Sequence, residues 1–137
     1  MPRFDVKGKR LLEIHEKYYL GDVSLRHALL GYREGDISGV LENLVFLELK
    51  RRGYQVYIGK FDNREIDFIA EKENRKIYIQ VAYLLESQQT IEKEFSVLKS
   101  INDNYPKYVI SMDDIFGRDV EGIQRINLVD FLLDPEI

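Results

Sequence analysis

One segment limits the possible folds more than any other, the apolar stretch "DISGVLENLVFLELKRRGY" from Asp36 to Tyr54. Its apolar residues recur every three or four positions, the period of one helix face. They are Ile37, Leu41, Leu44, Val45 and Leu49, and Phe46 and Leu47 widen the stripe. A helix with so wide an apolar surface must be buried on more than one side, so we expect it to lie across a sheet.

The ends of this helix are also marked. Asp36 or Ser38 can cap its first turn, because a short polar side chain accepts a hydrogen bond from an unpaired helix N–H. Gly53 stands where a helix commonly ends, at a position that favours positive φ.

Three strand-like runs follow the helix. Tyr54–Phe61 alternates Tyr54, Val56 and Ile58 against Gln55, Tyr57 and Gly59, and Arg64–Lys72 alternates Ile66, Phe68 and Ala70 against Asp67, Ile69 and Glu71. Lys76–Leu85 is almost continuously apolar, and a tight polar turn, Glu73-Asn74-Arg75, precedes it. Alternation and short turns predict a meander with antiparallel pairing.

The remaining chain predicts a helix over Ser87–Ser100, a strand within Tyr105–Asp113, a short strand at Ile123–Asn127 and a terminal helical turn. This order gives an α/β domain with a mixed central sheet. We expect residues 1–20 to form an N-terminal arm left from an upstream region, and 21–137 to form the domain, with a further helix over Leu20–Tyr32.

Composition excludes several classes of protein. The chain has 137 residues, the size of one domain, and with 45% hydrophobic and 32% charged residues it has the balance of a soluble globule. It has no cysteine, which excludes disulfides, thiolate metal sites and cysteine nucleophiles. No apolar run approaches the roughly 20 residues of a membrane span, and the N-terminus lacks a signal peptide. We expect a cytoplasmic protein that makes no contact with membranes.

The net charge of −4 disfavours non-specific attraction to nucleic acid over the whole surface. Binding to nucleic acid would need a local basic patch, and Lys50-Arg51-Arg52 is the best candidate. The alternative is that these cations simply occupy a helix C-terminus, where the helix dipole favours positive charge.

Three polar residues lie inside apolar elements. Glu42 is in the first helix, Asp67 lies between Ile66 and Phe68, and Gln80 is on the next strand. A carboxylate in an apolar element is costly unless it is paired or binds a metal. Carboxylate and amide oxygens are the ligands that Mg²⁺ prefers, and such an ion can activate water for phosphoryl chemistry. Glu42 and Asp67 are therefore candidate Mg²⁺ ligands.

This pattern resembles the PD-(D/E)xK nuclease superfamily, which has a helix glutamate, a strand aspartate and then (E/Q)-x-K. Here these positions read Glu42, Asp67 and Gln80-Val81-Ala82. The phrases "LENLVFLELKRRGY", "REIDFIA" and "KYYLGDVSLRHALLGY" are similar to an uncharacterised C-terminal domain that follows the P-loop module and winged helix of bacterial and archaeal AAA-type ATPases. The resemblance runs from about Arg3 to Leu133 and implies a restriction-endonuclease-like, three-layer core.

The chain departs from the superfamily pattern at one position. Ala82 replaces the lysine, and a methyl group can neither position a water nor stabilise developing charge. Lys76, Lys50 or Lys60 are candidates for a relocated lysine, but Lys76 lies roughly 13 Å along the strand from Gln80 at about 3.3 Å per residue.

Each site residue also has a structural interpretation. Glu42 can pair with Arg64 or Arg33, Asp67 can be a solvent-facing strand residue like Glu65, and Gln80 can be an amide with its hydrogen bonds satisfied. The tyrosines, Tyr18, Tyr19 and Tyr83 among them, can stack on bases but suit core packing better.

The resemblance implies an accessory domain of an AAA-type ATPase with a degenerate nuclease centre formed by Glu42, Asp67 and Gln80. Such a domain would bind nucleic acid or protein, or act as a scaffold. The alternative is an active metal-dependent DNA nuclease with a relocated lysine. The chain has no phosphate-binding G-x-x-x-x-G-K-[ST] loop, so we expect no ATP hydrolysis by it. Expected partners are the ATPase module, DNA and a second copy of the chain, with Mg²⁺ as the candidate cofactor.

Overall fold

The protein is a mixed α/β domain built on one sheet. The computed structural model describes residues 34–61, 63–85, 88–114 and 119–134. Its elements, in chain order, are α3 (Glu34–Arg51), β1 (Gln55–Phe61), β2 (Arg64–Lys72), β3 (Arg75–Val81), α4 (Gln88–Ser100), β4 (Lys107–Ser111), β5 (Ile123–Asn127) and α5 (Leu128–Leu133). The predicted N-terminal arm and the helix expected over Leu20–Tyr32 lie outside the described residues.

The sheet has five strands in the order β1-β2-β3-β4-β5. The first three strands form the predicted antiparallel meander, whereas β3, β4 and β5 run parallel to one another. Helix α4 connects β3 to β4, as parallel neighbours require a crossover connection. The mixed central sheet predicted from the sequence is confirmed.

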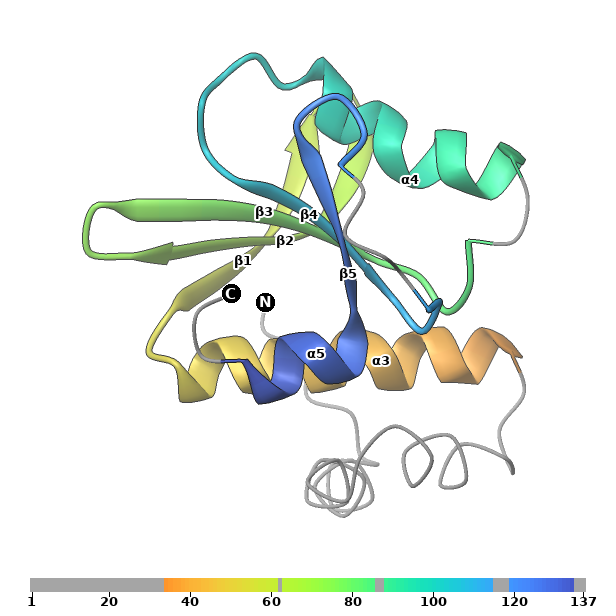
Figure 1. The fold of residues 1–137 in the computed structure, drawn as a ribbon. Helices are drawn as coiled ribbons and strands as arrows, with labels where there is room; N and C mark the ends of the chain where they lie inside the picture. The colour runs from red at the N-terminus through yellow and green to blue at the C-terminus, as the bar shows by residue number, and fades with distance from the viewer. Residues whose placement is uncertain (1–33, 62, 86–87, 115–118, 135–137) are drawn as a thin grey trace.

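Helices cover both faces of the sheet, with α3 and α5 on one face and α4 on the other (Figure 1). Two apolar clusters fill the interfaces. The α3 cluster joins α3 and α5 to the sheet, and includes Leu41, Leu44, Phe68, Ile79 and Phe131. The α4 cluster joins α4 to the other face, and includes Ile66, Tyr78, Ala82, Phe95 and Val109. None of the described helices has both the length and the apolar character needed to cross a bilayer.

Helix α3 ends as predicted but begins earlier. Gly53 has a φ of 91°, and the amides of Gly53 and Tyr54 donate to the carbonyls of Lys50 and Leu49. This closing pattern is common where a glycine follows a helix. The cap predicted at Asp36 or Ser38 is wrong, because the helix already begins at Glu34. Burial of its apolar stripe outweighs the local preference of short polar residues for helix ends.

Strand β2 departs from simple alternation. Tyr57 and Gly59, two residues apart on β1, pair with Ile69 and Ile66, which are three apart on β2. The extra residue is a β-bulge, which changes the face to which the side chains beyond it point. Ile66 and Ile69 consequently both contact the α4 cluster, while Phe68 belongs to the α3 cluster. The prediction that Ile66, Phe68 and Ala70 share one face is therefore wrong for Ile66.

The bulge also explains an unexpected burial pattern on β1. Gly59 is buried and Ile58 is 39% exposed, the reverse of the predicted alternation. A Cβ added at Gly59 would lie 2.6 Å from Ile69 Cδ1 and 3.0 Å from Ile66 Cβ. Only glycine leaves room for both isoleucines on this face, so the bulge at Asp67 and the glycine opposite it depend on each other.

Candidate functional site

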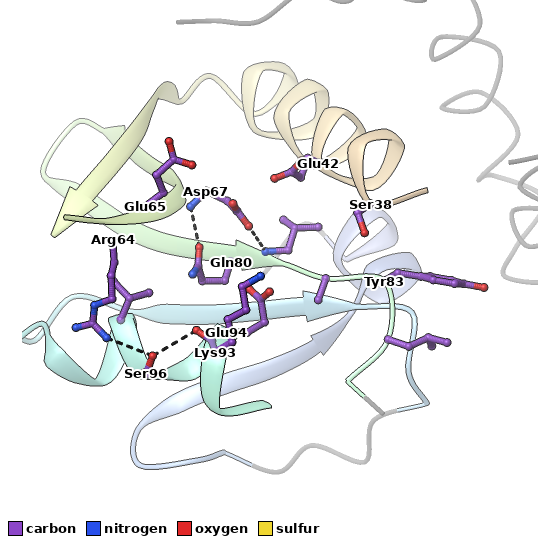
Figure 2. Close-up of a pocket in the computed structure, with 14 residues that line it drawn as sticks. Ser38, Glu42, Arg64, Glu65, Asp67, Gln80, Tyr83, Lys93, Glu94 and Ser96 are labelled. Atoms are coloured by element: carbon purple, nitrogen blue, oxygen red, sulfur yellow. Dashed lines mark hydrogen bonds between the residues drawn. The ribbon is translucent and has the colours of Figure 1, made fainter. Parts of the chain in front are cut away.

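A cavity of about 750 Å³ opens between α3, α4 and the point where β2 and β3 separate. Figure 2 shows Glu42 reaching from α3 toward Asp67 on β2, and Lys93 and Glu94 approaching from α4. The cavity is lined mostly by polar side chains: Ser38, Glu42, Arg64, Glu65, Asp67, Gln80, Lys93, Glu94 and Ser96, together with Val81, Ala82, Tyr83, Leu84 and Val97. We call it the acidic pocket.

At the edge of this pocket, hydrogen bonds from side chains replace the backbone hydrogen bonds between β2 and β3. Regular pairing of β2 with β3 reaches Phe68 and Ile79. Beyond that pair, the Asp67 amide donates to Gln80 Oε1 at 2.7 Å, and the Val81 amide donates to Asp67 Oδ2 at 2.8 Å. These two bonds satisfy the backbone groups that strand separation would leave unpaired. They also hold Asp67 at the pocket wall.

Asp67 and Glu42 form a close pair of carboxyl groups. Burial raises the pKa of Asp67, and the charge of Glu65 adds to this effect; the Val81 amide, a side-chain hydrogen bond with Glu42 and the Lys93 charge oppose it. A hydrogen bond between two carboxyl groups requires a proton on one of them. The two carboxyl groups are therefore placed to share a proton.

Glu94 belongs to the same charge cluster. Burial, followed by the charge of Asp67, raises the pKa of Glu94 to about 7, and Lys93 acts in the opposite direction. Crowded acids in a cleft with displaced pKa values are a common mark of functional sites.

The three residues predicted to form a centre all lie in the acidic pocket: Glu42, Asp67 and Gln80. Their roles differ. The two carboxyl groups face each other, whereas the Gln80 oxygen accepts a hydrogen bond from the β2 backbone. Gln80 thus has the satisfied-amide arrangement that the sequence left open. Ala82, in the lysine position of the resembling superfamily, also lines the pocket and is 7% exposed.

None of the lysines named from the sequence lines the acidic pocket. Lys76 instead lies over the rings of Tyr78 and Tyr105, at 5.3 and 5.5 Å from their centroids. Lys50 and Lys60 are exposed elsewhere. Lys93 on α4 is the lysine in the pocket, and sequence reasoning missed it. Helical spacing gave no signal, because residues one and two positions before the buried Phe95 do not share its face of α4.

The cationic segment at the end of α3 has structural partners. Arg52 donates to Glu48, Phe131 and Asp134, and Arg51 donates to Glu48 through both Nε and Nη2. A phosphate would have to compete with these bonds. Contact of Lys50-Arg51-Arg52 with nucleic acid stays a prediction.

Arg64 was expected to form an ion pair with Glu42. In the structure its guanidinium group instead donates hydrogen bonds to Ser96 and Ser100.

The donor set fits a hard cation with few protein ligands. Glu42 and Asp67 supply carboxylate oxygens from two elements. In the described part of the chain, no group of three or more acidic, histidine or cysteine side chains is placed to hold a metal ion. Mg²⁺ often binds through one or two carboxylates and keeps several waters. A weakly held, largely hydrated divalent ion is what this pair would accept.

Comparison with known proteins gives relatives without a stated activity. No family model matches the chain. An uncharacterized protein of Haemophilus influenzae is 39% identical over 131 residues, which is 96% of this chain and 32% of that protein. An uncharacterized protein of Methanocaldococcus jannaschii is 34% identical over 99 residues, 66% of this chain and 21% of that protein. The chain thus spans a third or less of the length of these curated relatives.

Proposed function

We propose that the chain is a nuclease-like accessory domain of an AAA-type ATPase, with a restriction-endonuclease-like core. Its cleavage centre is degenerate, and the acidic pocket serves to bind nucleic acid or a protein partner. The observation that carries the proposal is the pairing of Glu42 with Asp67 at one pocket wall.

Two further features support this proposal. The β-bulge that points Asp67 into the pocket is a device often found beside active sites. The relatives are about three times longer than the aligned region or more, as expected if this unit is attached to other modules. An ATPase module as the attached unit follows from the motif resemblance alone.

Loss of cleavage follows from the side chains around the acid pair. Ala82 offers only a methyl group at the pocket wall, so it supplies no charge to a transition state. Gln80 contributes an amide where a carboxylate would bind a divalent ion more strongly. Glu42 and Asp67, with no third carboxylate ligand among the described residues and no lysine at the position of Ala82, would form a cleavage centre that binds a metal ion weakly.

Lys93 favours a second candidate function, an active metal-dependent nuclease with a relocated lysine. Its ammonium group enters the acidic pocket from α4 and is close enough to lower the pKa values of both Asp67 and Glu94. A cation in that place can stabilise negative charge on a phosphoryl group held by the acid pair.

A cleavage assay separates the two functions. The purified chain is incubated with branched, single-stranded and duplex DNA in Mn²⁺. A degenerate centre gives no cleavage of any substrate. A working nuclease gives cleavage that disappears in Asp67→Ala and in Lys93→Ala.

The matched control is Lys99→Ala, which removes a lysine from the same helix outside the pocket. Cleavage that needs Asp67 and Lys93 but not Lys99 establishes the second function and rules out the degenerate centre. Cleavage that survives Asp67→Ala comes from a contaminant or another site, and contradicts both.

A further inference from the structure

A second polar feature lies at the rim of the acidic pocket, where β2 begins. Arg64 donates from Nη1 to Ser96 Oγ at 3.3 Å and from Nη2 to Ser100 Oγ at 2.8 Å. Both serine hydroxyls direct their own hydrogens into α4, toward the carbonyls of Lys93 and Ser96. Two neutral oxygen acceptors therefore hold the guanidinium group against α4, and Figure 2 shows the bond to Ser96.

The charge of Arg64 is not neutralised by this arrangement. Within the described ranges, Arg64 has no ion pair with a carboxylate, although its side chain lines a pocket that contains several. Two of the five guanidinium N–H groups are used by the serines, which leaves three. The group is exposed, so an anion from solution can reach these donors.

The neighbouring residues extend this feature along α4. Lys93, Ser96 and Ser100 are three and four positions apart, so they lie on one side of the helix. From Lys93 to Ser100 the helix rises about 10 Å at ~1.5 Å per residue. That length corresponds to about three nucleotide steps along one strand of a duplex, at ~3.4 Å of helix axis per step.

We infer that Arg64, held by Ser96 and Ser100, is a phosphate-binding point that seats the sugar–phosphate backbone of a nucleic acid strand at the mouth of the acidic pocket. A planar guanidinium group that is already oriented suits a phosphate, which accepts two parallel N–H bonds. The inference rests on the proposed function and adds to it the ligand class and the direction of approach. It favours nucleic acid over a protein partner.

Binding is measured by fluorescence anisotropy with a fluorescein-labelled single-stranded DNA oligonucleotide, over a range of salt concentrations and in the presence of Mg²⁺. We expect Arg64→Ala to weaken binding about three- to tenfold and to reduce the salt slope by about 0.7, the value for one phosphate contact to a single strand. The double variant Ser96→Ala/Ser100→Ala keeps the charge but frees the guanidinium group. It should weaken binding with an unchanged salt slope.

The matched control is Arg75→Ala, which removes the same charge at the β2–β3 turn, away from the pocket. Equal loss in Arg75→Ala and Arg64→Ala, or wild-type binding by Arg64→Ala, overturns the inference. If the wild-type chain binds Mn²⁺ at Asp67 but no oligonucleotide, the inference fails and the acid-pair site stands. If it binds neither, the proposed function fails as well.

Discussion

In the described part of the chain, two clusters of charged residues place acidic side chains in different surroundings, one around the buried Glu48 and one in the half-buried acidic pocket. At the C-terminal end of α3, Glu48 is fully buried and lies 2.6 Å from Nη2 of Arg51 and from Nε of Arg52. In the acidic pocket, Glu42 and Asp67 face each other, with Glu94 nearby. Two arginines are in direct contact with Glu48, whereas among the described residues the charge of Lys93 is the cation that acts on Asp67 and Glu94.

The pKa values follow this difference. Burial by itself would raise the pKa of Glu48, but hydrogen bonds and charge from Arg51 and Arg52 outweigh it, and the net shift is downward. In the pocket, burial and the charge of Glu65 raise the pKa of Asp67, and burial and the charge of Asp67 raise the pKa of Glu94. Removal of one partner from a buried ion pair is destabilising, whereas a group of acids with raised pKa values in a cleft is a common mark of a binding site.

The largest effect should come from breaking the neutralised cluster. Arg52→Ala removes a cation whose side chain is 10% exposed, its bonds to the carbonyls of Phe131 and Asp134, and its stacking 4.6 Å from the Phe131 ring. We expect the free energy of unfolding to fall by about 3 kcal/mol, because Glu48 is left buried with one partner fewer. Urea denaturation measures this change.

Arg51→Ala is the matched control for that variant, since the Arg51 side chain is 53% exposed. Arg51→Ala should lower the free energy of unfolding by only about 0.5–1 kcal/mol. Similar losses for the two arginines would mean that Arg52 does not connect α3 to α5 in the way described.

The next largest effect tests how β2 places Asp67 in the pocket. Gly59→Ala introduces a Cβ 2.6 Å from Ile69 Cδ1 and 2.8 Å from its Cγ1. We expect a loss of roughly 2 kcal/mol from overpacking, together with shifted amide NMR signals for Asp67.

Gly39→Ala provides the contrast, because no atom of the described residues lies within 4 Å of a Cβ added at this position of α3. It should raise stability by about 0.5–1 kcal/mol through helix propensity. A Gly59→Ala variant as stable as the wild-type chain would show that the bulge does not depend on this glycine.

A smaller effect distinguishes the two clusters by pH. The folded-state pKa of Glu94, about 7, is above the ordinary glutamate value, so folding is favoured by its protonation. The contribution of Glu94 to stability is therefore full at low pH and is lost as pH rises from about 4.3 through 7. Glu48 behaves oppositely: its contribution is present above the ordinary glutamate value and is lost as pH falls through its lowered pKa.

Glu94→Gln should accordingly raise the free energy of unfolding at pH 8 by only about 1 kcal/mol, because water at the pocket mouth screens the charge. It should also flatten the dependence of the free energy of unfolding on pH between about pH 5 and 7. Denaturant unfolding at several pH values checks this result. Glu65→Gln, an exposed acid of the same pocket, should change stability by less than about 0.5 kcal/mol. If the free energy of unfolding of Glu94→Gln falls above pH 5 as steeply as that of the wild-type chain, the raised pKa of Glu94 is contradicted.

Much of the fold could be predicted from the sequence because the local signals agree with one another. The stripe of α3, the β2–β3 turn and β5 at Ile123–Asn127 all appear where periodicity and turn residues placed them. Errors occurred where tertiary contacts overrule local rules. The bulge in β2 depends on Gly59 of the neighbouring strand, and alternation within β2 alone cannot reveal it.

The candidate site was predictable only in part. Glu42, Asp67 and Gln80 stood out as polar residues inside apolar elements, and they do meet. Lys93 and Glu94 did not stand out, because charged residues on an amphipathic helix are ordinary in sequence, and Arg64 was named only as a possible partner of Glu42. Their place in the pocket depends on how α4 crosses the sheet, which no local pattern specifies.

The most direct test of the acid-pair site is a titration of the ¹⁵N-labelled chain with Mn²⁺, a paramagnetic ion that broadens NMR signals near its binding site. We predict that the amide signals of Glu42, Asp67 and Val81 broaden at lower Mn²⁺ concentration than those of Glu48 and Arg52, and that Asp67→Asn abolishes the effect. Broadening that begins around Glu48, or a pattern that Asp67→Asn leaves unchanged, would contradict the view that the two acidic clusters serve different purposes.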